Sequence, residues 1–296
     1  MTALAIDIGG TKIAAALVDG NTLVHRTQVP TPQTSAEDAW HATADLITTT
    51  LAAGAGGAVE AVGISSAGPV DLGAGAISPV NIGVWRDFPI VARVAELTGL
   101  RVRLGGDGLC MALGEHRYGA GRGAQFVLGM VVSTGIGGGL VLDGMPYDGR
   151  TGNAGHVGHT VIELDGQRCP CGGRGCVETV ASGPSMTRWA RAQGWAGADA
   201  RELAADVQRD DPIAVEAFRR GATAVAAMIA STGAVCDLDL VVIGGGVAKA
   251  GPVLFDPLRA ALADYAGLTF LRDLRVVAAE LGSDAGLIGA GVLAIS

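Results

Sequence analysis

The chain has 296 residues, 47 of them glycine, and its 49% hydrophobic and 17% charged content excludes an intrinsically disordered protein. A formal net charge of −8, with no cluster of lysine and arginine, argues against nucleic acid or an anionic membrane surface as a partner. At about 100 to 200 residues per domain, this length predicts two domains.

The amino-terminal residues enter a strand pattern at once, without the basic and apolar segments of a signal peptide. No apolar run of about 18 residues follows anywhere in the chain. We therefore expect a cytoplasmic protein.

Short apolar runs separated by glycine turns open the chain, and such runs predict the strands of a meander. They lie at 4–8, 13–18 and 23–28. The pattern over 35–51 changes to that of a helix, and 59–64 predicts another buried strand. The loop 65–71 follows that strand, at an edge where α/β sheets usually hold ligands.

The second half repeats this arrangement. A strand over 126–132 leads into the glycine-rich segment 133–139, which predicts a turn, and 140–142 continues as a strand. Asp143-Gly144 then predicts a tight turn, as Asp19-Gly20 does in the first half. Two such units predict a duplicated α/β fold.

Helices are expected as far as Gly233, the last of them opened by Asp211-Pro212. A final buried strand over 238–243 and a closing apolar helix over 283–293 complete the pattern.

Two glycine-rich turns carry the groups that a nucleotide phosphate and its magnesium ion require. The segment 7–12 combines a carboxylate, two glycines, a hydroxyl and an ammonium, and the segment 134–139 holds the corresponding place in the second half. Either turn alone indicates only a hairpin, but the pair favours phosphate binding. The glycines 244–246 can admit a flat base or a ribose, although a simple strand-to-helix turn is nearly as good an interpretation. The candidate ATP contacts are Asp7, Gly9, Gly10, Thr11, Lys12, Thr134, Gly135, Gly137, Gly138, Gly245 and Gly246.

Neither turn is a P-loop, because the Gly-x4-Gly-Lys-Ser/Thr pattern is absent from the sequence. Neither opens a helix with Gly-x-Gly-x-x-Gly, which disfavours a dinucleotide-binding dehydrogenase.

Three of the five cysteines cluster near a histidine. His159, Cys169, Cys171 and Cys176 lie in a segment rich in glycine. Three thiolates and one imidazole predict a closed tetrahedral zinc site, which leaves no position for a reactive water. The zinc ion is therefore expected to be structural and to hold the nearby His156 and Glu178 in place.

Asp107 directly follows the apolar strand residues 102–104 and precedes a helical pattern. A carboxylate at this edge can act as a general base in a cleft, although an isolated aspartate there more often caps a helix.

Taken together, these segments resemble the ROK family of bacterial sugar kinases. The resemblance rests, in chain order, on 7–12, 67–71, 106–107 with 112–115, 133–139, 155–159 and 169–178. It implies an α/β actin-like ATPase fold of hexokinase type (ribonuclease H-like, duplicated), with ATP on the glycine turns and a sugar between two domains. It also implies a homodimer or homotetramer.

The resemblance assigns Asp107 as the catalytic base for the 6-hydroxyl of the sugar and Asp7 as the residue near magnesium. Positions expected to contact the sugar are Gly68, Asn81, Gly106, Asp107, His156, His159 and Glu178. For Asn81, a plain loop position is an equal alternative. A ROK-type repressor is disfavoured because only six residues precede Asp7.

Two positions depart from the family pattern. This chain has Gly106 where the family has an asparagine, and His156 where the family has a glutamate. In the family, that asparagine and that glutamate bind hydroxyl groups of the sugar ring. Losing both partners is expected to impair binding of ordinary glucose. This predicts a sugar altered around carbon 3 or 4, such as kanosamine (3-amino-3-deoxyglucose). An ordinary glucokinase, a cyclitol kinase, an N-acylhexosamine kinase and a catalytically weak sugar sensor remain as alternatives.

The expected domains are 1–104, a small α/β domain completed by a helix at 284–296, and 105–283, a large α/β domain with the zinc-binding insert 155–178.

Overall fold

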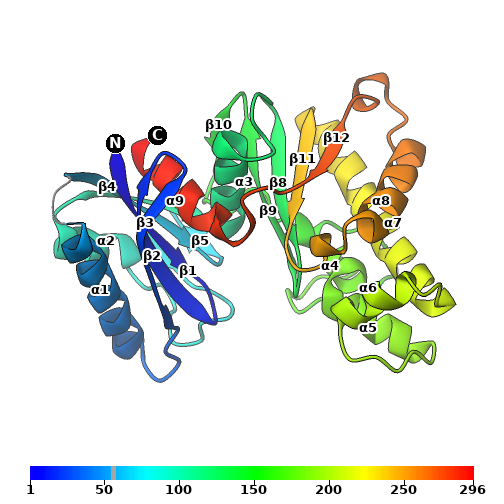
Figure 1. Cartoon of the computed structure of the whole chain (residues 1–296), viewed down its shortest axis with the longest axis horizontal. Coiled ribbons are helices and arrows are strands. Elements are labelled where there is room, and N and C mark those ends of the chain that lie inside the picture. Colours follow the sequence, from blue (N-terminus) through cyan, green and yellow to red (C-terminus); the bar gives the residue numbers. More distant parts are fainter. Residues whose placement is uncertain (55–57) are drawn as a thin grey trace.

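Two α/β lobes lie side by side in the structure, a computed structural model that describes residues 1–54 and 58–296 (Figure 1). Each lobe is built on a five-stranded sheet, and the two sheets have the same strand order. The predicted duplication and the α/β fold class are therefore confirmed.

The N-terminal sheet has the order β3-β2-β1-β4-β7. Its strands are β1 (Thr2–Ile8), β2 (Lys12–Asp19), β3 (Thr22–Pro30), β4 (Val59–Ser66) and β7 (Arg101–Gly106). The first three form an antiparallel meander, and β4 and β7 add to it in parallel. Most residues of β1 and β4 are buried, as expected for the central strands of a sheet that is covered on both faces.

Helix α1 (Ala36–Ala53) packs on β2 and β3, and helix α2 (Ile90–Thr98) packs on β7. The side chain of Ser35 accepts a hydrogen bond from the amide of Asp38 and so caps the start of α1. A small hairpin of β5 (Val70–Asp71) and β6 (Ala76–Ile77) follows β4.

The C-terminal sheet has the order β10-β9-β8-β11-β12 and again joins a three-stranded meander to two parallel strands. Its strands are β8 (Val127–Val132), β9 (Ile136–Leu142), β10 (Met145–Tyr147), β11 (Leu240–Gly244) and β12 (Arg275–Ala278). The helices of this lobe are α4 (Glu178–Ala181), α5 (Gly183–Ala192), α6 (Ala200–Val207), α7 (Pro212–Cys236) and α8 (Pro252–Tyr265).

Two helices form the layer between the sheets, α3 (Asp107–Tyr118) and α9 (Ala285–Ile295) (Figure 1). α9 packs on β1 and β4 of the N-terminal sheet, and α3 packs on β8 and β9. Glycine allows these close approaches, since a Cβ at Gly63 would overlap the carbonyl of Ala290 and one at Gly139 would overlap the backbone of Leu109.

The expected elements are present, with one main difference. Strand β9 begins at Ile136, so the turn covers only 133–135 and the last three glycines of the predicted turn lie in the strand. They belong there because α3 packs directly on this part of β9. The expected boundary at 104 lies inside β7, which continues to Gly106. Among the described residues, no helix is long and apolar enough to span a membrane.

Candidate active site

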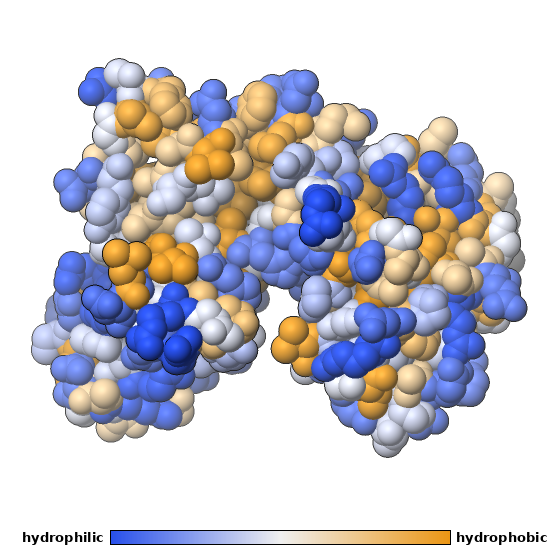
Figure 2. Space-filling model, turned by 180° about the vertical axis from the view of Figure 1, so that it is seen from behind, coloured by the Kyte–Doolittle hydropathy of each residue, from blue (hydrophilic) through white to orange (hydrophobic). Residues whose placement is uncertain are grey.

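The two lobes meet along one side of the molecule and are separated on the other by a cleft, which opens at the bottom of the view in Figure 2. The first turn predicted to bind phosphate joins β1 to β2, where the amide of Gly9 donates to the carbonyl of Lys12 at 3.0 Å. The side chain of Asn81 lies against this turn, since a Cβ at Gly10 would be 2.5 Å from its Cγ. Asn81 thus lies beside the turn that is predicted to bind phosphate.

Asp7, the last residue but one of β1, has a largely buried carboxylate. Its Oδ1 accepts a hydrogen bond from the hydroxyl of Ser65 at 2.7 Å. Burial raises the pKa of Asp7, while the Ser65 hydroxyl and the charges of Lys12 and Arg26 act in the opposite direction. A cation near Asp7 would relieve the cost of keeping this carboxylate ionised.

Asp107 is the first residue of α3, and Gly106, not Asp107, is the N-cap. Asp107 remains accessible to solvent, and its Oδ1 accepts a hydrogen bond from the amide of Gly108 at 2.7 Å. Loss of surrounding water raises the pKa of Asp107, the Gly108 amide lowers it, and the charge of Asp7 raises it further. The carboxylates of Asp7 and Asp107 are therefore close enough to repel each other. The raised pKa of Asp107 also suits a general base.

The second turn, between β8 and β9, is held by a side chain from far along the chain. Oε2 of Glu178 accepts a hydrogen bond from the amide of Ile136 at 2.7 Å, and a Cβ at Gly135 would lie 2.7 Å from the same oxygen. Glu178, expected from the family resemblance to contact the sugar, thus also supports the turn that is expected to hold phosphate.

Gly68 and His156 meet across the lobes. A Cβ at Gly68 would lie 3.1 Å from Cε1 of His156, so the ring packs closely against the backbone of Gly68. Burial lowers the pKa of His156, and the neighbouring His159 lowers it further. At Gly106 the nearest atom to an added Cβ is the carbonyl oxygen of Gly152, at 4.0 Å, so the missing side chain leaves open space.

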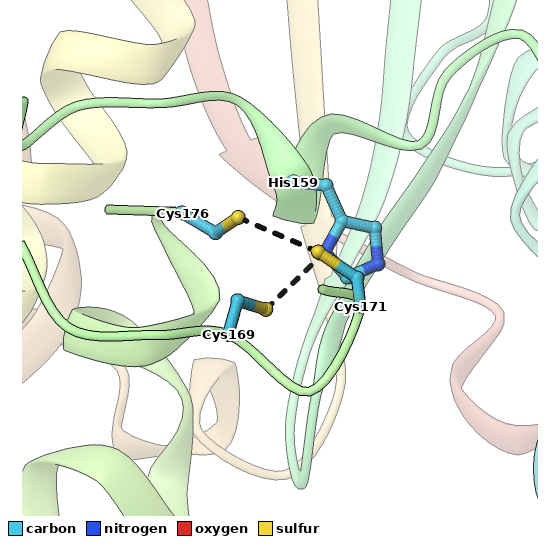
Figure 3. Close-up of side chains that lie close together, drawn as sticks. All are labelled: His159, Cys169, Cys171 and Cys176. Atoms are coloured by element: carbon cyan, nitrogen blue, oxygen red, sulfur yellow. Dashed lines mark hydrogen bonds between the residues drawn. The ribbon is translucent and has the colours of Figure 1, made fainter. Parts of the chain in front are cut away.

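The four predicted metal ligands converge (Figure 3). One ligand atom from each of His159, Cys169, Cys171 and Cys176 lies within 4.8 Å of the others. Sγ of Cys171 is 3.8 Å from Sγ of Cys176, and Sγ of Cys169 is 3.8 Å from Nδ1 of His159. Ligands roughly 2.3 Å from a tetrahedral zinc ion are separated by about this distance, so the residues fit the metal.

The glycines after β11 lie against the second turn, because a Cβ at Gly245 would be 2.5 Å from the carbonyl oxygen of Val132 and one at Gly246 would be 3.2 Å from Oγ of Ser133. Beside them is a cavity of about 270 Å³, lined by Gly246, Lys249 and residues of α6 such as Ala204. A larger cavity of about 700 Å³ between α8 and β12 contains none of the predicted site residues.

The structure thus brings Asp7 near Asp107, Asn81 to Gly10, Gly68 to His156 and the metal ligands together. For Thr134, it shows no contact that bears on the prediction. Sequence reasoning missed the bonds of Glu178 to Ile136 and of Asn153 to Val70, which join residues 42 and 83 positions apart. Such pairs leave no local pattern in a single sequence.

Paired α/β lobes of this topology, with two equivalent glycine turns and two carboxylates close to each other, define a phosphotransferase of the hexokinase type with the actin-like ATPase fold. The model of the ROK family matches residues 3–296, so the chain belongs to the ROK family. It is a sugar kinase.

Three similar proteins show what this chain resembles. It is 39% identical to an N-acetylmannosamine kinase of Citrobacter koseri, over 99% of both chains. It is 38% identical to a ROK hexokinase of Thermus thermophilus, with a TM-score of 0.91 over 100% of this chain and 98% of that one. It is 33% identical to a ROK family glucokinase of Streptomyces griseus, solved with glucose and AMPPNP, with a TM-score of 0.83 over 100% of this chain and 99% of that one.

Proposed function

We propose that this sugar kinase transfers the γ-phosphoryl group of ATP to the 6-hydroxyl of a hexose-like sugar, with Asp107 as the general base. The observation that carries this proposal is the carboxylate of Asp107, which is accessible to solvent at the start of α3, lies near Asp7 and has a raised pKa. Such a group can accept the hydroxyl proton as the oxygen attacks phosphorus.

ATP would lie along the two glycine turns. The Streptomyces griseus relative was solved with AMPPNP, an ATP analogue, which supports this assignment. In the arrangement that we propose, the turns hold the phosphates, Asp7 lies near the magnesium ion, and the cavity beside Gly246 receives the base. Most of the catalytic effect would come from positioning and charge neutralisation rather than from covalent chemistry.

For the sugar, we infer a hexosamine. The open space at Gly106 and the imidazole of His156 favour a substituent near carbon 3 or 4, as in kanosamine. The similarity to an N-acetylmannosamine kinase favours an N-acylated hexosamine as the second candidate, and the similarity to a glucokinase keeps glucose in the test.

The His159, Cys169, Cys171 and Cys176 cluster would hold a structural zinc ion. His156 precedes this set by three residues and Glu178 follows it by two. A zinc ion there would fix the segment between His156, which is expected to contact the sugar, and Glu178, which supports the β8–β9 turn. The expected homodimer or homotetramer stays a prediction, which light scattering on the purified protein tests.

The test is an ADP-release assay with Mg-ATP across kanosamine, N-acetylmannosamine, N-acetylglucosamine, glucose, mannose and a cyclitol. We expect turnover with a hexosamine to exceed that with glucose. Turnover greatest with glucose would contradict the substrate inference, and binding of a sugar without ADP release from any of them would indicate a sensor.

A further inference from the structure

We propose that Asn153 is a positioning residue that joins the two lobes and thereby sets the width of the sugar pocket; this inference rests on the proposed function. Nδ2 of Asn153 donates to the carbonyl of Val70 at 2.7 Å, and the amide of Val70 donates to Oδ1 of Asn153 at 3.1 Å. One side chain thus makes both bonds that a residue in a neighbouring strand would make to β5.

The contact between the two segments extends beyond this pair. The amide of Leu72 donates to the carbonyl of Thr151 at 3.3 Å. Between Thr151 and Asn153, Gly152 has a φ of +96°, and a Cβ there would lie 2.6 Å from Cγ of Leu72. The segment 151–153 is therefore held tightly against 70–72 of the other lobe, with no room for a larger residue at 152.

This bridge lies next to groups that the proposed function uses. Gly68 is two residues before Val70, and His156 is three residues after Asn153, so the bridge and the Gly68–His156 contact are parts of one junction. The carbonyl of Gly152 also lies nearest to the open space at Gly106. Asn153 therefore fixes how far the ring of His156 stands from the backbone of Gly68.

The consequence concerns sugar binding more than the chemical step. Asn153 touches neither Asp107 nor the glycine turns, so its loss should leave the phosphates and the base in place. Without both hydrogen bonds, the gap between Gly68 and His156 is no longer fixed. Hydrogen bonds to ring hydroxyls then weaken, and we expect the KM for the sugar to rise on the order of 10-fold.

The experiment compares N153A, N153D and the control N21A, which changes an exposed asparagine in the turn between β2 and β3. For each protein, the KM for sugar, the KM for ATP, kcat, the Tm and the calorimetric Kd of the best sugar are measured. We expect N153A to raise the KM and Kd for sugar, with kcat and the KM for ATP within about 2-fold of the wild type. N153D retains an acceptor for the Val70 amide but no donor for its carbonyl, so it should show the same loss with a matching side-chain volume.

The inference is overturned if both Asn153 variants keep the wild-type KM for sugar, or if the KM values for sugar and ATP rise together with a lower Tm, which would show a merely structural role. If N153A does not fold, N153D decides between these outcomes. Failure of the proposed function is seen separately, because then the wild-type protein releases no ADP with any sugar of the panel.

Discussion

The two sheets of this protein share one topology but differ in the side chains at their equivalent turns. The turn after β1 is flanked by Asp7, whose carboxylate accepts a hydrogen bond from the Ser65 hydroxyl, and by Lys12, the first residue of β2. The equivalent turn after β8 carries no charged residue of its own, and the carboxylate of Glu178 reaches it from another segment. Asp107 follows the last strand of the first sheet, β7.

The comparison shows that a duplicated scaffold need not duplicate its chemistry. Both halves supply backbone amides at a hairpin turn, whereas the proposed base and the proposed magnesium-side carboxylate come from the first half and from its junction with α3. The second half adds the Cys/His cluster. The following experiments test this division.

The largest effect should come from the base. Asp107→Asn removes the proton acceptor while preserving shape, so we expect kcat to fall roughly 10²- to 10⁴-fold with an unchanged fold. Steady-state ADP release measures this, with Asp45→Asn on the exposed side of α1 as a matched control. Retained activity in Asp107→Asn would place the chemistry elsewhere.

Next is the metal cluster of the second half. Cys176→Ser, or removal of the metal by a chelator, should lower activity about 10- to 100-fold because His156 and Glu178 lose their support. It should also lower the Tm. Cys236→Ser lies outside the cluster and is the control. Metal analysis should find about one zinc per chain, and a metal-free protein of unchanged Tm would contradict the structural role.

A several-fold effect is expected at the second turn. Nothing lies within 4 Å of a Cβ added at Gly137, so Gly137→Ala should fold normally. If the backbone there approaches a phosphate, the added methyl group should raise the KM for ATP and leave the KM for sugar unchanged. Gly267→Ala, equally open and distant, is the control. An unchanged KM for ATP would confine phosphate binding to residues 133–135 and the first turn.

The smallest effect concerns stability. The raised pKa of Asp107 means that its ionised form is disfavoured in the folded protein. Its ionisation therefore costs stability as pH rises through that pKa, and the cost vanishes below pH 3.8, the ordinary value. Asp107→Asn should thus raise the Tm at pH 7 by at most a few degrees, with the gain shrinking in acid. A lower Tm for the variant at pH 7 would show that the carboxylate is stabilising.

Much of this architecture could be predicted from local patterns. Apolar runs ended by glycine turns indicated the meanders of both sheets, and the helical pattern over 35–51 indicated α1. The Cys/His cluster was readable because its four ligands lie within 18 residues. These features depend on neighbours in sequence.

What escaped prediction depends on neighbours in space. The glycines of β9 were predicted to be turn residues, but they allow α3 to pack closely on the strand. The periodicity of the sequence contains no signal for such a contact. The carboxylate of Glu115 is fully buried and accepts amide bonds from Glu280 and Leu281, 165 and 166 positions away. It thereby ties α3 to the segment that leads into α9. The link of Asn153 to Val70 is of the same kind.

The position of α9 has a consequence for the order in which the protein can be made. Residues of β1 and β4 leave the ribosome long before 285–295, yet α9 covers one face of their sheet. At Gly63 the backbone of the strand directly contacts the backbone of α9 at Ala290. During synthesis this apolar face therefore stays uncovered until α9 has been made. The nascent first lobe should need a chaperone or a transient partner until then.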